Sequence, residues 1–161
     1  MILFVDETEN NEFFIVAGLL VNSREDAEVA YSRFKKSVKQ IPIPEKKRAH
    51  IFTEFKSGLL DRDFKRIKIK MLEEVNNMEH RIIYSCYIKN GEYFSQKLKE
   101  GAYITLLSKI VSSIENDFSI IFDTFNKKDF EDCIVDRLSS YKNVQAIMPR
   151  DSQNVNGSIE M

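Results

Sequence analysis

The chain has 161 residues, and a domain of this length can bury roughly two thirds of the surface that its unfolded form exposes. Hydrophobic residues make up 43% of it, which is enough for one core. Its 24 Lys and Arg nearly balance its 25 Asp and Glu, which excludes a strongly basic nucleic-acid-coating protein and an acidic disordered chain. Two cysteines without a Cys-x-x-Cys pair exclude a disulfide scaffold and a zinc ribbon, and suit a reducing compartment.

No segment has the ~20 consecutive apolar residues that a membrane-spanning helix needs. The longest apolar run, residues 13–21, is much shorter. The N-terminus also lacks the basic region and cleavage site of a signal peptide. We therefore expect a cytoplasmic protein with no membrane partner.

The first part of the chain predicts a hairpin followed by a helix. Residues 2–7 are an aliphatic run ending in two acids, which is typical of a buried strand. After a polar turn, residues 13–21 are apolar on both faces, as in a central strand. So short a turn favours antiparallel pairing. Ser23 is the expected N-cap of a helix that ends before Pro42.

Helices and strands then alternate. Residues 50–56 fit either a short strand or an extended edge segment. Helices are expected to begin at Asp61, near Asn90 and at Asn126, and strands are expected at residues 81–88, 118–123 and 144–148. This order predicts an α/β fold, a mixed β-sheet with an N-terminal antiparallel hairpin and helices packed on its faces. Without a repeat or a long linker, residues 1–161 are expected to form a single domain.

Two acids follow apolar strand sequence, and they are the main candidates for chemistry. Asp6 and Asp123 each come directly after four or five apolar residues of a predicted strand. Ligand sites of open α/β sheets gather at the carboxyl ends of strands. Two carboxylates brought together there repel each other unless a cation lies between them, and Mg²⁺ or Mn²⁺ suits carboxylate oxygens. The alternative is that both acids are ordinary turn-formers.

The segment around Glu54 supplies two further candidates. In Phe52-Thr-Glu-Phe-Lys, Glu54 shares a side with an apolar residue, which suggests a functional role for its carboxylate. Lys56 could offer its charge to a phosphate. A surface ion pair between Glu54 and Lys56 is the alternative interpretation.

Basic residues gather on either side of this segment, at residues 35–48 and 62–70. Folded together, they could form a face that contacts phosphates. The alternative is that they are the solvated sides of two helices.

Several other site types do not fit the sequence. An aspartyl phosphatase would need a second Asp where Thr8 stands. No glycine-rich phosphate loop follows the first strand, and His50 and His80 have no metal-ligand spacing.

Taken in order, these motifs resemble the family called domain of unknown function 3800, which is regarded as ribonuclease H-like. Its members open with a strand ending Asp-Glu-Ser-Gly, then carry a Glu-x-Lys segment, a strand ending in Asp, and a closing Asp-Ser…Asn-x-Gly-x-Gln-x-Ala-Asp pattern. The matching segments here are Phe4-Val-Asp-Glu-Thr-Glu, Glu54-Phe-Lys, Ile120-Ile-Phe-Asp, and Asp151-Ser followed by Asn156-Gly-Ser-Ile-Glu-Met.

The chain departs from this pattern at its C-terminal end. Glu160 stands where the family has Gln, and the sequence stops before the Ala-Asp that would supply the last acid. The resemblance therefore implies a C-terminally truncated copy with an incomplete last helix and impaired catalysis. Asp151 or Glu160 could partly replace the missing carboxylate.

The resemblance implies a nuclease that hydrolyses phosphodiester bonds with two Mg²⁺ or Mn²⁺ ions about 4 Å apart. Asp6 would bridge the ions, Glu54 and Asp123 would complete the coordination, and Lys56 would lie near the scissile phosphate. The implied partner is a nucleic acid, either DNA or RNA. The alternative function is a non-catalytic interaction module on the same fold, for example as a homodimer.

Overall fold

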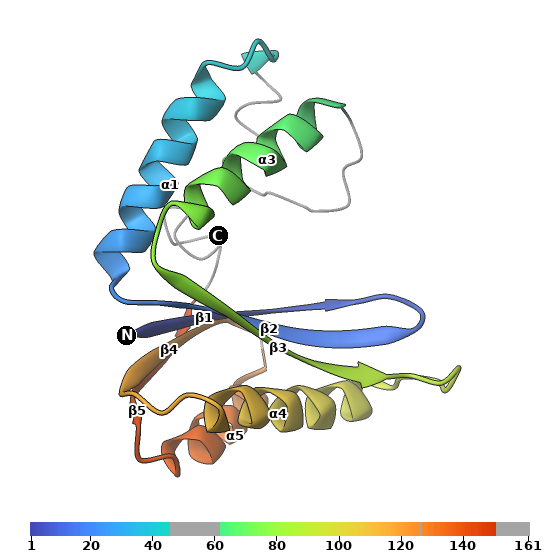
Figure 1. The fold of residues 1–161 in the computed structure, drawn as a ribbon. Coiled ribbons are helices and arrows are strands. Elements are labelled where there is room, and N and C mark those ends of the chain that lie inside the picture. Colours follow the sequence, from blue (N-terminus) through green and yellow to red (C-terminus); the bar gives the residue numbers. More distant parts are fainter. Residues whose placement is uncertain (46–61, 126, 151–161) are drawn as a thin grey trace. The chain divides into compact units, whose positions relative to one another are not determined.

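The computed structural model describes residues 1–45, 62–125 and 127–150 (Figure 1). The chain divides into two compact units. The first is built from Met1–Leu20 and Arg81–Asp151, and the second is centred on Val21–His80. The prediction of a single domain over residues 1–161 stays a prediction.

The first unit contains a five-stranded sheet with the strand order β3-β2-β1-β4-β5. The strands are β1 (Ile2–Glu9), β2 (Phe13–Val21), β3 (His80–Ile88), β4 (Phe118–Asp123) and β5 (Val144–Arg150). β1 runs parallel to β4, and β4 runs parallel to β5. Only three residues join β1 to β2, and so short a connection permits only antiparallel pairing.

The direction of β3 relative to β2 makes this a mixed sheet, with parallel and antiparallel strand pairs. The amide of Lys89, just after β3, donates to the carbonyl of Glu12, just before β2, with the two atoms 2.8 Å apart. The end of β3 therefore lies beside the start of β2, and these strands are antiparallel. β2 is an interior strand, as its apolar sequence predicts.

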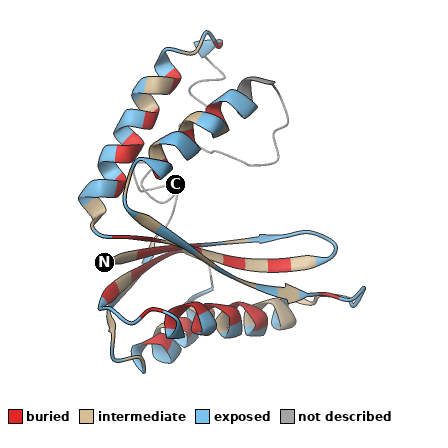
Figure 2. Ribbon diagram, in the orientation of Figure 1, coloured by how far each residue is buried: buried red, intermediate tan, exposed pale blue. Residues whose placement is uncertain are grey.

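Two helices of the first unit, α4 (Gln96–Ser112) and α5 (Lys128–Ser139), pack on one face of the sheet (Figure 1). Buried residues alternate with less buried ones along β2, because successive side chains point to opposite faces (Figure 2). The core under the helices includes Leu3, Phe14, Tyr103, Ile120 and Ile134.

The second unit contains α1 (Arg24–Lys39) and α3 (Arg62–Asn76), which pack against each other. Their shared core includes Phe34, Val38 and Ile67. Ser23 caps α1 as predicted, since its hydroxyl accepts a hydrogen bond from the Asp26 amide at 3.1 Å.

The structure confirms the predicted α/β class, the hairpin and the mixed sheet. It moves the start of one helix. Asn90 and Gly91 have positive φ angles of 49° and 75° and form a turn, and α4 begins later, after its N-cap Ser95. α5 follows Lys127, which makes no capping side-chain bond, and the predicted cap Asn126 lies outside the described residues. None of the described helices is long and apolar enough to cross a membrane.

Candidate functional site

The structure places Asp6 and Asp123 side by side on neighbouring strands. In the parallel pairing of β1 with β4, Val5 lies opposite Phe122. The next residues in this register are Asp6 and Asp123. Asp123 is the last residue of β4, as predicted, whereas β1 continues beyond Asp6 to Glu9.

Both aspartates point to the same face of the sheet. Val5 and Phe122 belong to the core beneath α4 and α5. Because side chains alternate along a strand, the residues that follow them point to the opposite face. The two carboxylates therefore share the face that α4 and α5 leave uncovered.

A backbone hydrogen bond orients each carboxylate. The Glu7 amide donates to Asp6 Oδ1 at 2.8 Å, and the Thr124 amide donates to Asp123 Oδ1 at 2.9 Å. Each bond comes from the residue directly after the aspartate, so the strand itself restrains the side chain. Two acceptor groups are thus held at adjacent positions before any ligand binds.

The surroundings of Asp6 disfavour its negative charge. Although Asp6 is exposed at the surface, neighbouring protein displaces part of its hydration, and this desolvation raises its pKa. The hydrogen bond from the Glu7 amide opposes the rise, and the negative charge of Asp123 adds to it. A cation between the two carboxylates would relieve this repulsion.

A second group of polar residues lies on the helix-covered side of β1. Glu7 has a raised pKa, first through desolvation and then through the charge of Asp6, while Lys99 of α4 opposes the rise. The pKa of the buried Tyr103 hydroxyl is well above 10, because of desolvation and the charges of Glu7, Asp6 and Asp123. Tyr103 therefore stays protonated at neutral pH and can only act as a neutral polar group.

Neither Tyr103 nor Glu7 is among the candidate site residues that the sequence pattern predicts. Glu7 could have been noticed because it directly follows Asp6 in the strand. Tyr103 has the weaker signal of one hydroxyl on an apolar helix, three residues before the core residue Leu106.

The other predicted site residues, Glu54, Lys56, Asp151 and Glu160, lie outside the described residues. Within the described part of the chain, no group of three or more His, Cys, Asp or Glu could hold a metal ion. Of the predicted ligands, the structure thus brings together Asp6 and Asp123. Two hard carboxylate ligands fit Mg²⁺ or Mn²⁺, since Mg²⁺ is commonly bound by one or two carboxylates together with water and phosphate oxygens.

Comparison with known proteins supports the fold of the chain, but neither a family nor a function. No family model matches the chain, so the resemblance to domain of unknown function 3800 stays a prediction, and no curated protein matches it. Among solved structures, it is similar to ribonuclease HII in the PCNA:RNase HII complex from Archaeoglobus fulgidus, with a TM-score of 0.56. The sequences are 11% identical, and the match covers 99% of this chain and 69% of the other. Together with the mixed five-stranded sheet, this similarity shows that the chain has a ribonuclease H-like fold.

Proposed function

We propose that the chain is a nuclease-like protein that hydrolyses phosphodiester bonds with the help of divalent metal ions. The observation that carries the proposal is the pair Asp6 and Asp123, adjacent on parallel strands of a ribonuclease H-like sheet. The similarity to ribonuclease HII supports a nucleic acid as the substrate. DNA and RNA both remain candidate substrates.

Asp6 and Asp123 would hold the metal, and Glu54 is the third ligand that the family resemblance implies. Bound Mg²⁺ or Mn²⁺ would supply Lewis-acid chemistry, activating water and stabilising the charge on the leaving oxygen. The Glu7 and Thr124 amides would keep the two aspartates oriented toward it. Lys56 would contribute positive charge near the phosphate.

Metal binding is tested first, without a substrate. A ligand that binds the native state raises the melting temperature, so Mn²⁺ is expected to stabilise the protein against heat. Asp6→Asn and Asp123→Asn are each expected to abolish the shift. The control is Asp132→Asn, which removes an exposed carboxylate of α5 and should leave the shift unchanged.

Cleavage is tested with labelled single-stranded DNA, double-stranded DNA, RNA and an RNA–DNA hybrid, each with Mg²⁺, with Mn²⁺ and with EDTA. Asp6→Asn is expected to lower the cleavage rate at least about a hundredfold, because several kcal/mol of transition-state stabilisation come from the metal. An Mn²⁺ shift that Asp6→Asn does not alter, or cleavage that persists in EDTA, would contradict the proposal.

The second candidate is a non-catalytic interaction module, and the exposed face of β3 favours it. β3 is an edge strand of the sheet, and Ile82, Tyr84 and Ile88 are 60%, 70% and 58% exposed. Their alternate spacing places these apolar side chains on one face. Absence of any metal-dependent shift, together with dimerisation that Tyr84→Lys disrupts in light scattering, would favour this function.

A further inference from the structure

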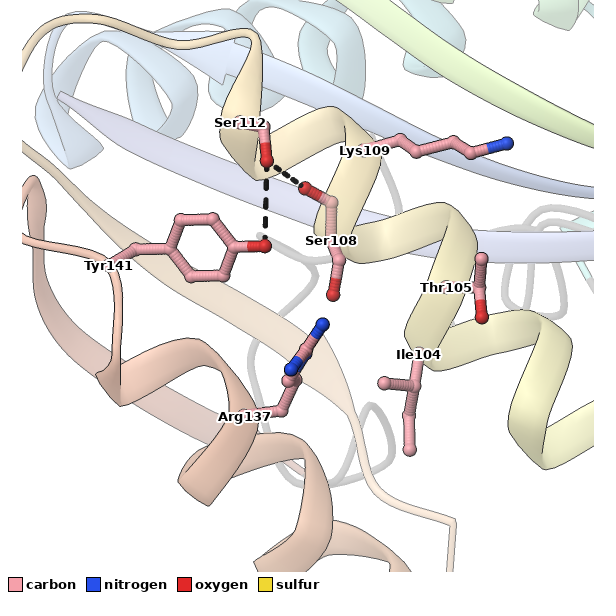
Figure 3. Close-up of a pocket in the computed structure, with 7 residues that line it drawn as sticks. All are labelled: Ile104, Thr105, Ser108, Lys109, Ser112, Arg137 and Tyr141. Atoms are coloured by element: carbon pink, nitrogen blue, oxygen red, sulfur yellow. Dashed lines mark hydrogen bonds between the residues drawn. The ribbon is translucent and has the colours of Figure 1, made fainter.

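A cleft of about 510 Å³ lies between α4 and the C-terminal end of α5, within the first unit (Figure 3). Its lining is rich in hydroxyl groups, with two cations and no carboxylate. The polar lining residues are Thr105, Ser108, Lys109 and Ser112 of α4, Arg137 of α5, and Tyr141 just after α5. A pocket with this charge and these groups suits an anion.

Ser108 is the feature that most needs an explanation. It is a buried polar residue, 8% exposed, and its Oγ has no hydrogen-bond partner among the described residues. Buried hydroxyls are nearly always paired, because an unpaired one loses its bonds to water without compensation. In Figure 3 this oxygen points from α4 toward Arg137 on the facing helix. The Ser108 hydroxyl is therefore a candidate donor to a ligand that reaches it from the cleft.

Arg137 supplies the charge opposite this hydroxyl. It is an exposed residue and makes no ion pair within the described residues. The planar guanidinium group binds phosphate oxygens with two parallel hydrogen bonds. Lys109 extends along α4 away from Arg137, so it adds positive charge at the rim of the cleft (Figure 3).

Ser112 and Tyr141 form a second polar wall. The Ser112 hydroxyl donates to the Ser108 carbonyl at 2.7 Å, and its oxygen lies 3.4 Å from the Tyr141 hydroxyl. The Ser112 hydroxyl proton is shared between the Ser108 carbonyl and, more weakly, the Tyr141 oxygen, which leaves the Tyr141 proton free for a ligand. The contact with Ser112 lowers the pKa of Tyr141, desolvation opposes this change, and smaller effects of the Ser108 hydroxyl and of the Arg137 charge act in the lowering direction.

We propose that this cleft binds a small molecule carrying a phosphate monoester, with its phosphate held by Arg137 and the Ser108 hydroxyl. Tyr141 would donate a further hydrogen bond. The cleft is within the size range of small-molecule pockets and larger than a phosphate ion needs, so an organic group is expected to occupy the rest. Ile104, the apolar lining residue, would contact that group. The site is independent of Asp6 and Asp123, which lie on the other face of the sheet.

The test uses the full chain and three probes at constant ionic strength: phenyl phosphate, inorganic phosphate and dimethyl phosphate. Two-dimensional amide NMR spectra would locate the binding. Phenyl phosphate is expected to shift amides of residues 104–112 and 137–141 with a Kd of about 1 mM or below. Inorganic phosphate is expected to shift the same amides more weakly. Dimethyl phosphate, which resembles a nucleic-acid backbone, is expected to bind at least about tenfold more weakly than phenyl phosphate because it carries half the charge.

Two variants and one control identify the site. Arg137→Gln is expected to weaken phenyl phosphate binding about tenfold or more, since a charge-assisted hydrogen-bond pair is lost. Ser108→Ala is expected to weaken it severalfold while leaving the melting temperature unchanged or raised, because it removes an unpaired buried hydroxyl. Arg81→Gln changes an exposed arginine of β3 and should leave the affinity unchanged.

Three results would overturn the proposal. The first is no amide shift in the cleft at 10-fold the expected Kd, roughly 10 mM phenyl phosphate. The second is binding that Arg137→Gln leaves unchanged. The third is dimethyl phosphate binding as tightly as phenyl phosphate, which would assign the cleft to backbone phosphates of a nucleic acid instead.

Discussion

Asp6 is placed where its negative charge weakens the native state unless something compensates it. Its pKa is raised by desolvation and by the nearby charge of Asp123, and the amide of Glu7 offsets only part of this effect. Groups kept in such positions are often functional, because binding needs charge that folding alone disfavours. The unfavourable position of Asp6 is thus consistent with a metal ligand.

The first prediction concerns the pH dependence of stability without metal. A carboxyl group whose pKa is higher in the folded than in the unfolded chain costs stability as the pH rises through the folded pKa. Asp6→Asn cannot ionise, so in EDTA it is expected to be more stable than the original protein at neutral pH. The difference should shrink as the pH falls toward 3.8, the ordinary pKa of the group, and vanish below it.

Urea unfolding in EDTA over a range of pH values measures this difference. Saturating Mn²⁺ is expected to reverse its sign at neutral pH, because the original protein alone gains the binding energy. A less stable Asp6→Asn protein in EDTA at neutral pH would show that the Asp6 carboxylate has a structural role instead.

At the level of elements, β2 packs closely against β1 and α4 at Gly18. Gly18 of β2 has no side chain, and a Cβ atom built there would lie 2.6 Å from Leu3 Cδ1 and 3.7 Å from Ile110 Cγ2. Leu3 belongs to β1, the strand that carries Asp6, and Ile110 belongs to α4. The absence of a side chain at Gly18 therefore allows these elements to pack together.

The second prediction compares two glycines. Gly18→Ala is expected to lower the free energy of unfolding by about 1–3 kcal/mol, because the added methyl group overpacks the core. Gly101 of α4 has nothing within 4 Å of a built Cβ, so Gly101→Ala is expected to raise that free energy by about 0.5–1 kcal/mol through helix propensity. Urea unfolding of both variants measures the contrast, and a neutral Gly18→Ala would show that Leu3 can shift without cost.

At the level of the whole molecule, the candidate site combines residues from both chain segments of the first unit. Asp6 comes from the opening strand and Asp123 from the fourth, and the parallel register of β1 with β4 makes them neighbours. The cleft between α4 and α5 lies on the helix-covered side of the same sheet. One sheet thus separates two polar sites of opposite character, one acidic and one basic.

The third prediction is that Asp6 and Asp123 are energetically coupled in the metal-free protein. Each change to Asn removes the same repulsion, so the double variant is expected to gain less stability than the sum of the single variants. Urea unfolding in EDTA at neutral pH measures the four proteins of this double-mutant cycle. Strict additivity would mean that the two carboxylates do not interact, and the proposed shared metal site would lose its basis.

Local sequence predicted most of the described elements. The apolar run at residues 13–21 became β2, and Ser23 became the cap of α1, because both depend on neighbouring residues alone. The start of α4 was predicted too early, because Asn90 and Gly91 form a separate turn before the Ser95 cap. Local sequence does not separate these two cases well. A helix can start directly at a turn, or it can start a few residues later at its own cap.

The amino-acid sequence by itself determined the alternation of strands and helices and the position of an acid after each of two apolar strands. Only the tertiary structure decided that Asp6 and Asp123 are neighbours on one face, and that Ser108 and Arg137 line the same cleft. Hydrophobic periodicity predicts which side of an element is buried. It does not predict which distant element covers that side. Strand order, register and helix pairing supply this information, because they follow from packing among segments far apart in the chain.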